Sequence, residues 1–378
     1  MNTDFRDRPI AAALKPTHTY EPDFVTPPGE ILEEKLQELG MSQAELADRI
    51  GRTKKTVNEI IKAKAPLLPE TAIQLERVLG IPARFWTNAE ANYRQFLAFQ
   101  EETRRLAEQR EFLKELPTAQ LVKAGWLPKR ADPVARLRDM LQFFGVASLD
   151  ALSQIGKVKR LAFRQSAAHK VNQYALLAWL RIGEIEAQKI QCVPYDSKTF
   201  RHALHSIRNE LCNKPVPEAA VQMVQACAES GVALVFVPEI PGCRAWGVTQ
   251  WISPERAILQ LSLRGKTDDQ FWFTFFHEAA HILHHPKKDI YVEMDNQQDE
   301  REQQANAFAR DILIPPQDWK KVALARPRSA SEVRTWAERL NVPPGVLVGR
   351  LQHERMLPWT HLNGLKVKLR GFPGNKAA

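Results

Sequence analysis

His277 and His281 stand four residues apart in the sequence, and Glu278 directly follows the first of them. On an α-helix, side chains at positions i and i+4 project from one face about 5–6 Å apart, so both imidazoles can bind one metal ion. Zinc takes N, S and O ligands in a near-tetrahedral set, and a catalytic zinc keeps one position for water. Glu278 lies about 100° further around such a helix, where its carboxylate can reach that water. The spacing therefore predicts a zinc-dependent hydrolase in which Glu278 is the general base.

A catalytic zinc needs a third protein ligand, and a second helical pattern supplies one. Over residues 299–313 the apolar positions fall on one face, and Glu302 lies toward that face, one turn before Asn306. We expect Glu302 to complete the metal ligands, with Glu300 as the reserve candidate. We expect Asn306 to accept the second N–H of a metal-binding histidine, which would fix the orientation of that ring.

The alternative is that a chance H-E-x-x-H sequence lies on a solvated helix face. The neighbouring sequence argues against this, because residues 271–276 include five aromatic side chains and predict a buried helix. Three ionisable side chains buried there without partners would be strongly destabilising. Residues 265–315 also carry 5 basic and 10 acidic side chains, and such an acidic segment suits a cation site. We therefore favour the metal site.

The element that positions the two histidines should be a long helix. Thr267 and Gln270 have the spacing of a capping box, in which two side chains satisfy free N–H groups at a helix start. Pro286 cannot continue a helix, so we expect the helix to end before it. Upstream, a helix over 218–229 is followed by β-rich runs that predict a small three-stranded sheet, at residues 232–237, 245–252 and 257–263.

A second group of chemically informative residues lies near the start of the chain. Ser42 and Thr53 each precede an amphipathic helical pattern, and Gly51 allows a tight turn between the two helices. Residues 49–64 carry six basic side chains and one acidic side chain. Polar side chains on the second helix would face a DNA groove, where lysine can donate to guanine or phosphate and asparagine can pair with adenine. The pattern predicts a helix-turn-helix that binds double-stranded operator DNA.

The composition of the chain limits the class of protein, the number of domains and the cellular location that we expect. The chain has 378 residues, of which 44% are hydrophobic and 26% charged, and this predicts two or three soluble globular domains. The N-terminal residues lack an apolar signal segment and the four cysteines include no C-x-x-C pair, so we expect a cytoplasmic protein without membrane association. The composition of residues 91–214 indicates helices, and this segment carries 21 basic and 12 acidic side chains. This basic segment is itself a candidate for binding nucleic acid or an acidic protein.

Residues 215 to about 355 resemble the metallopeptidase domain of the ImmA/IrrE family. In that family H-E-x-x-H is followed by a helix of the form E-x-x-A-N-x-F-A, which here runs from Glu302 to Ala309. The resemblance implies a compact zincin with Zn²⁺ held by His277, His281 and Glu302, and limited proteolysis of a regulatory protein. The helix pair predicted at 331–341 and 343–353 resembles the helix-turn-helix-like tail of these proteins and is expected to pack against the peptidase. Thermolysin-like relatives have an acidic residue at position 306, where this chain has asparagine.

Residues 27 to about 95 resemble the XRE (Cro/C1-type) helix-turn-helix, and the part from 66 to 86 is similar to HigA-type antitoxins. The resemblance implies that six residues, one at the start of the first helix and the others at the start of or along the second, contact DNA: Gln43, Thr53, Lys54, Lys55, Asn58 and Glu59. Helix-turn-helix proteins commonly bind two half-sites as dimers, so we expect a homodimer.

The predicted fold class is mainly α with a small β-sheet, in several domains. In chain order these are a flexible N-terminal arm (1–26), a helix-turn-helix DNA-binding domain (27–90), a basic helical middle region (91–214), a zincin-like metallopeptidase domain (215–325), helix-turn-helix-like C-terminal helices (326–360) and a basic tail (361–378).

These features favour a DNA-binding transcriptional regulator whose zinc endopeptidase domain cleaves a repressor or an antitoxin-like protein. The alternative is a HigA-like antitoxin or repressor in which the zincin domain is non-catalytic and binds a metal, a ligand or a toxin. An intact H-E-x-x-H sequence does not decide between them, because a fold can keep its site geometry without turnover.

Overall fold

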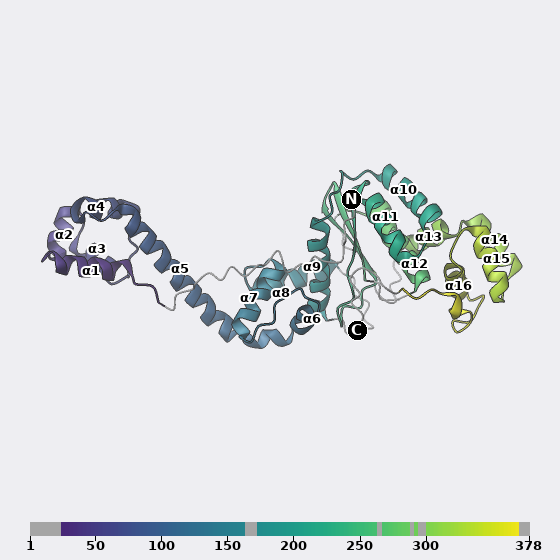
Figure 1. Cartoon of the computed structure of the whole chain (residues 1–378), viewed down its shortest axis with the longest axis horizontal. Coiled ribbons are helices and arrows are strands. Elements are labelled where there is room, and N and C mark those ends of the chain that lie inside the picture. Colours follow the sequence, from purple (N-terminus) through teal and green to yellow (C-terminus); the bar gives the residue numbers. More distant parts are fainter. Residues whose placement is uncertain (1–23, 163–171, 263–266, 288–290, 294–299, 370–378) are drawn as a thin grey trace. The chain divides into compact units, whose positions relative to one another are not determined.

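The computed structural model describes residues 24–162, 172–262, 267–287, 291–293 and 300–369 (Figure 1). The predicted N-terminal arm up to residue 23 and the end of the basic tail lie outside these residues. Backbone contacts divide the described chain into two compact units. One unit extends to Phe112 and includes 130–137, and the other contains 113–129 and the chain from Arg138 onward.

The first unit consists of helices, with bounds α1 Pro28–Glu38, α2 Gln43–Ile50, α3 Lys54–Ile61, α4 Pro69–Leu79 and α5 Ala83–Glu108. Ser42 accepts a hydrogen bond from the backbone N–H of Glu45 (3.1 Å), and Thr53 caps α3 in the same way. Gly51 ends α2 with φ +66°, a left-handed conformation that favours glycine. A core that includes Leu46, Ile50, Val57 and Ile60 holds α2 against α3.

Helix α5 continues through residue 90, so no break in secondary structure marks the predicted boundary there. The predicted domain bounds stay predictions. Further along the chain lie α6 Thr118–Lys123, α7 Pro133–Phe144, α8 Leu149–Ala162, α9 Gln173–Gln188, α10 Ser197–Ser206 and α11 Val216–Ala228. None of the helices in the described part of the chain combines the length and the apolar character needed to cross a lipid bilayer.

A four-stranded sheet forms the centre of the second unit. Its strands are β1 Val232–Phe236, β2 Gly247–Ser253, β3 Arg256–Leu261 and β4 Tyr291–Glu293, in the order β1-β3-β2-β4. β1 pairs with β3 in parallel, whereas β2 pairs with β3 and β4 in antiparallel fashion. The three predicted strands are present, and β4 is a fourth strand that the sequence pattern did not predict. β4 has three residues, too few for the alternation of apolar and polar positions that identifies a strand.

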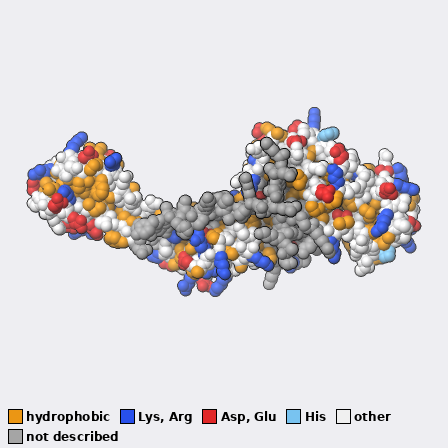
Figure 2. Space-filling view, in the orientation of Figure 1, with side chains coloured by type: hydrophobic (Ala, Val, Ile, Leu, Met, Phe, Trp, Pro, Cys, Tyr) orange, Lys and Arg blue, Asp and Glu red, His pale blue; other side chains and the backbone are white. Residues whose placement is uncertain are grey.

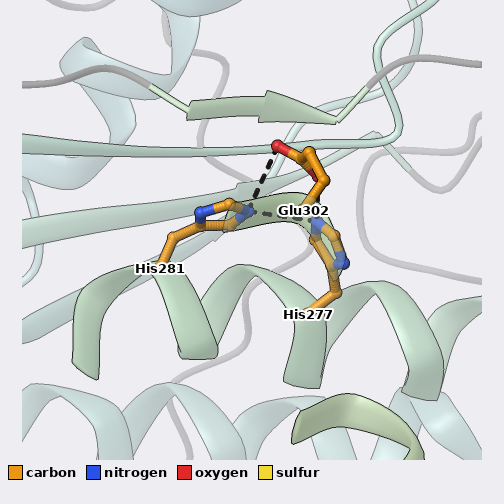
Figure 3. A group of neighbouring side chains, drawn as sticks. All are labelled: His277, His281 and Glu302. Carbon is orange, nitrogen blue, oxygen red and sulfur yellow. Dashed lines mark hydrogen bonds and ion pairs between the residues drawn. The ribbon is translucent and has the colours of Figure 1, made fainter. Parts of the chain in front are cut away.

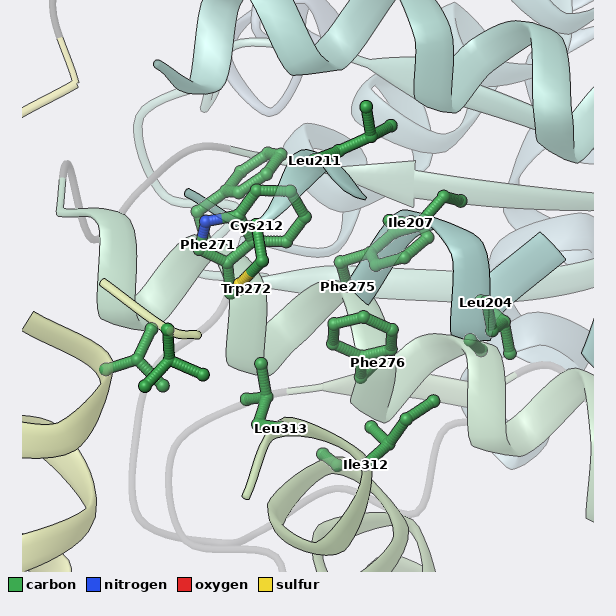
Figure 4. Packing of buried hydrophobic residues seen from close by; sticks show 14 of the residues in the cluster. Leu204, Ile207, Leu211, Cys212, Phe271, Trp272, Phe275, Phe276, Ile312 and Leu313 are labelled. Carbon is green, nitrogen blue, oxygen red and sulfur yellow. The ribbon is translucent and has the colours of Figure 1, made fainter. Parts of the chain in front are cut away.

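Helices cover both faces of this sheet, with α9 on one face and α11 and α12 Asp268–His284 on the other (Figure 1). On α12, Trp272, Phe275 and Phe276 are fully buried and pack with apolar side chains of α10 and of the chain after it (Figure 4). Burial of each aromatic side chain stabilises the fold by roughly 1.5–3 kcal/mol. The surrounding core fixes the rotation of α12, and with it the direction of the histidines.

Three helices follow α13 Glu300–Leu313, namely α14 Pro316–Ala325, α15 Ala330–Leu340 and α16 Pro344–His353. α16 packs against α12, as predicted for this pair of C-terminal helices. Buried Arg208 joins two of the helix ends by donating to the carbonyls of Leu313 (2.9 Å) and Leu340 (2.7 Å). A cation at these free carbonyls satisfies acceptors that the helices themselves leave unpaired.

The predicted capping box at the start of α12 is wrong. The Thr267 hydroxyl donates to the Oε1 atom of Gln270 (2.9 Å) and does not accept from the helix backbone. Asp268 takes that role instead, because its Oδ1 accepts the N–H groups of Asp269 (3.0 Å) and of Val367 (2.9 Å). A carboxylate is the stronger acceptor for helix N–H groups, and here it also ties the C-terminal segment to α12.

Candidate metal centre

α12 and α13 bring three candidate ligands together in the interior of the second unit (Figure 3). The Nε2 atoms of His277 and His281 lie 3.1 Å apart, as expected for side chains one turn apart on α12. Glu302 approaches from α13, with its Oε2 atom 3.0 Å from His277 Nε2 and its Oε1 atom 3.6 Å from His281 Nε2. All three residues are buried. Glu300 is exposed at the start of α13 and is not part of this group.

Asn306 determines which nitrogen of His277 faces the other two ligands. Its Oδ1 atom lies 3.0 Å from His277 Nδ1, and a carbonyl oxygen can only accept, so the Nδ1 atom carries the proton. In the neutral ring the Nε2 atom then presents a lone pair toward Glu302 and His281. Asn306 is one turn beyond Glu302 on α13, so one helix supplies both the carboxylate and the residue that orients the first histidine.

His285 plays the corresponding part for His281. Its Nδ1 atom lies 2.7 Å from His281 Nδ1, and its Nε2 atom lies 3.3 Å from the Oε1 atom of Gln304. The Oε1 atom of Gln304 can only accept a hydrogen bond, so His285 is protonated at Nε2. Its unprotonated Nδ1 atom then accepts a hydrogen bond from the Nδ1–H group of His281. Neither His285 nor Gln304 is among the site residues predicted from the sequence. The signal was the spacing of His277, His281 and His285, which recur every four residues, with His285 directly after the last residue of α12.

The geometry fits a zinc ion. Two imidazole nitrogens and a carboxylate oxygen are typical zinc ligands, with metal–ligand distances of about 2.0–2.2 Å. Ligands at that distance in a tetrahedral arrangement are about 3.3 Å apart. The two Nε2 atoms here are 3.1 Å apart, one oxygen of Glu302 lies 3.0 Å from His277 Nε2, and its other oxygen lies 3.6 Å from His281 Nε2. Three buried lone-pair donors directed at one point repel each other without a cation, so this arrangement favours a bound metal.

Electrostatics keeps the candidate ligands in the forms that bind a metal. Burial acts to raise the pKa of Glu302, whereas a proton held on the Nε2 atom of His277 or His281 in the metal-free site would donate to this carboxylate and lower its pKa to about 2. Burial disfavours the charged form of His281 and lowers its pKa to about 4, although Glu302 acts in the opposite direction. At neutral pH Glu302 is therefore an anion and His281 a neutral base, as metal binding requires.

Glu278 is fully buried between α12 and β2. The Oγ1 atom of Thr249 lies 2.8 Å from the Glu278 Oε2 atom and 2.9 Å from its backbone oxygen, so this hydroxyl can donate to either. Gly247, two residues earlier on the same face of β2, lies directly against the side chain of Glu278. Helix geometry alone places Glu278 beside the ligands, whereas its fixed orientation depends on a strand that the sequence pattern does not connect to it.

The helix-turn-helix unit presents the six predicted DNA contacts around the start of α3. Thr53, Lys54 and Lys55 are exposed, whereas Gln43, Asn58 and Glu59 are partly buried. The Nδ2 atom of Asn58 donates to the Gln43 Oε1 atom (3.2 Å), which links α2 to α3 at this surface. Positive and negative side chains are interspersed over this unit on the face in Figure 2. Within this mixed surface, Lys54 and Lys55 at the start of α3 are exposed cations that could attract DNA.

Comparisons with known families match both functional segments. Residues 243–352 match the model of the IrrE N-terminal-like domain, and residues 32–86 match a helix-turn-helix model. The matches confirm the predicted combination of an XRE-type helix-turn-helix with an ImmA/IrrE-like domain in one mainly helical chain. They also support a metallopeptidase-like fold for the second segment.

Curated relatives are similar to the N-terminal part of the chain. The uncharacterized HTH-type transcriptional regulator YddM of Escherichia coli (strain K12) is 38% identical over 61 residues, which are 16% of this chain and 65% of that protein. Virulence-associated protein I of Dichelobacter nodosus is 36% identical over 67 residues, 18% of this chain and 62% of that protein. The chain thus matches just under two thirds of the length of these relatives.

Among solved structures, an addiction module antidote protein of a HigA family from Coxiella burnetii is 27% identical to part of this chain. The match covers 22% of this chain and 91% of the antidote protein, with a TM-score of 0.21.

Proposed function

We propose that this chain is a DNA-binding transcriptional regulator with a zinc-dependent endopeptidase domain, and that it cleaves a repressor or an antitoxin-like protein. The observation that carries the proposal is the convergence of His277, His281 and Glu302 at 3.0–3.6 Å, with Glu278 buried on the same helix. The match to the IrrE N-terminal-like domain supports the same conclusion, because it covers all four residues.

Zinc held by the three ligands would polarise a peptide carbonyl and lower the pKa of a water molecule. Glu278 would take the proton of the attacking water and deliver it to the leaving amine. Thr249 fixes the Glu278 carboxylate by its hydroxyl group, and Gly247 leaves space for that carboxylate beside β2. Asn306 and His285 orient the two imidazoles, so that no ligand has to reorganise when a substrate binds.

The helix-turn-helix segment supplies the DNA-binding half of the proposal. We propose that Gln43, Thr53, Lys54, Lys55, Asn58 and Glu59 contact operator DNA and that two copies of the chain bind two half-sites. Capped helices, a left-handed Gly51 and the exposed lysines at the start of α3 support this assignment. Binding at an operator would bring the peptidase close to other regulators bound there.

The test combines the purified full-length chain, loaded with zinc, with each protein encoded beside it. The proposal predicts cleavage of at least one of them and its loss in Glu278→Gln, while Glu300→Gln, a neutralised exposed carboxylate on α13, cleaves like the wild type. Full cleavage by Glu278→Gln would show that the catalytic assignment is wrong. A wild type that binds zinc and operator DNA but cleaves none of these proteins would favour the non-catalytic antitoxin or repressor instead.

A further inference from the structure

A pocket with a volume of about 240 Å³ lies between α12, α13, α16 and the C-terminal segment. Most of its exposed surface is apolar and comes from Trp246, Phe273, Leu313, Ile314, Val346 and Trp359. Polar or charged residues also line it, namely Asp269, Gln270, Thr274, Arg310, Arg350, His353 and Lys366. This volume is many times the roughly 10–15 Å³ that one water molecule needs on the same measure, so the pocket has room for a bulky side chain. The mechanism above does not use this pocket.

Each of the two helices that carry the candidate metal ligands also lines the pocket. On α12, Gln270 and Phe273 lie on the same face as His277, and the rings of Phe273 and His277 are 6.1 Å apart between centroids. On α13, Arg310 lies two turns beyond Glu302 on one face. At 1.5 Å per residue, these wall residues are displaced from the ligands by about 6–12 Å along the helices.

The part of the pocket wall formed by Trp246 also adjoins the candidate catalytic residue. Trp246 immediately precedes Gly247, which lies against the Glu278 carboxyl group. Each chain segment that borders the pocket near the metal centre therefore also carries or contacts a functional residue of that centre. An extended peptide advances about 3.3–3.6 Å per residue, so a side chain two or three residues from the reacting carbonyl can reach this pocket.

Charged side chains in the walls lie in ion pairs. Lys366 Nζ is 2.7 Å from the Asp269 Oδ2 atom, and Glu354 lies near both Arg350 (3.0 Å) and Arg310 (3.8 Å). An ionised occupant would have to compete with these pairs, whereas an apolar occupant uses the aromatic and aliphatic surface that remains. The walls therefore favour a bulky apolar group.

We propose that this pocket is a specificity site that receives one bulky apolar side chain of the protein substrate, within two or three residues of the scissile bond. The inference rests on the proposed peptidase function and adds the class of sequence that the peptidase selects. Binding of that side chain would position the scissile bond relative to the metal centre.

The test uses the full-length zinc-loaded chain and hydroxamates, which bind zinc directly. Acetohydroxamate probes the metal centre alone, and two peptide-like hydroxamates that differ only in a benzyl or a methyl side chain probe the pocket. We expect the benzyl compound to bind the wild type at least about tenfold more tightly than the methyl compound. Trp359→Ala removes a wall whose side chain is 64% exposed, and Gln270→Trp fills the pocket from an exposed position, so both should fold.

In both variants the ratio of the two affinities should fall toward one, while acetohydroxamate binds as in the wild type. Leu324→Ala, at a residue that is 85% exposed and outside the pocket, should retain the wild-type ratio. Equal binding of the benzyl and methyl compounds to the wild type would overturn the specificity site and leave the metal centre intact. Failure of acetohydroxamate to bind would overturn the proposed function as well. Tight binding of a benzyl compound without a hydroxamate would assign the pocket to a free small molecule and overturn the proposal.

Discussion

Gly247 lies so close to Glu278 that a Cβ atom at position 247 would come within 2.6 Å of both the Cγ and the Oε1 atoms of that side chain. Real Cβ atoms do not approach other atoms this closely, so only glycine fits here while Glu278 keeps its position. The strand and the candidate general base are therefore coupled sterically, in addition to the hydrogen bond from Thr249.

Gly247→Ala should displace the Glu278 carboxylate without touching the three candidate ligands. Displacement of a catalytic group by about 1 Å can lower turnover about 100-fold, so we expect a loss of that size with zinc content unchanged. The control is Gly364→Ala, because a Cβ atom there meets no other atom within 4 Å. Wild-type turnover in Gly247→Ala would contradict the role assigned to Glu278.

His285→Ala should weaken zinc binding through its effect on His281. Loss of a partner that orients a metal-binding histidine commonly costs 10- to 100-fold in affinity, and we expect a decrease in that range. Gln304 is exposed, so Gln304→Ala removes the acceptor for His285 with little effect on packing and should change affinity in the same direction. The measurement is zinc affinity by competition with a chelator, together with the absorption spectrum of the Co²⁺-substituted protein.

The control for that experiment is His284→Ala, at the exposed last residue of α12 and directly before His285. If His284→Ala and His285→Ala had the same zinc affinity and the same Co²⁺ spectrum, the hydrogen bond between His285 and His281 would have no role in metal binding.

Helix periodicity accounts for most of what the sequence predicts about the candidate metal centre. His277, His281, Glu278 and Glu302 follow from spacing on two helices, and the structure places the three candidate ligands within reach of one ion. The orienting contact through Gln304 depends on how α12 packs against α13, which local patterns do not encode.

Two details of the fold escaped prediction for physical reasons. β4 has too few residues to show an alternating pattern, and it is recognisable only by its pairing with β2. The hydroxyl of Thr267 had the expected spacing for a cap, but the buried carboxylate of Asp268 bonds the backbone N–H groups instead. A capping pattern identifies where a helix starts more reliably than it identifies which atoms satisfy that start.

Asp268 should make stability depend on pH. Burial raises its pKa to about 6 from 3.8, and the charge of Asp269 adds to this, although backbone N–H groups act in the opposite direction. Because the pKa is higher in the folded state, the stabilisation is fully present below about pH 4 and is lost as pH rises through about 6. Asp268→Asn keeps an acceptor without the charge. At pH 8 we expect a free energy of unfolding about 1–3 kcal/mol above wild type, and no difference near pH 4.

Urea unfolding at pH 4, 6 and 8 measures that difference. Glu338→Gln, which neutralises an exposed carboxylate on α15, serves as the matched control and should show no such trend. A difference between Asp268→Asn and wild type that stays constant across this pH range would exclude burial of the charge as its cause.

Lys54→Ala and Lys55→Ala should each weaken binding to duplex DNA of arbitrary sequence. Both lysines are exposed at the start of α3, where contacts to phosphate would release counterions from the DNA. We expect the slope of log affinity against log salt concentration to decrease by about one for each substitution. Arg77→Ala removes an exposed cation from α4 and should leave the slope unchanged. Equal slopes for all variants would mean that α3 does not face the DNA backbone.

Zinc content of the purified chain, measured by elemental analysis after removal of loosely bound metal, is the most direct test of the account. We predict one zinc ion per chain for the wild type and for Glu300→Ala, and a strong loss of zinc for Glu302→Ala, because only Glu302 belongs to the buried group of three. A wild type that retains no zinc after incubation with the metal, or a Glu302→Ala variant that retains as much as the wild type, would contradict it.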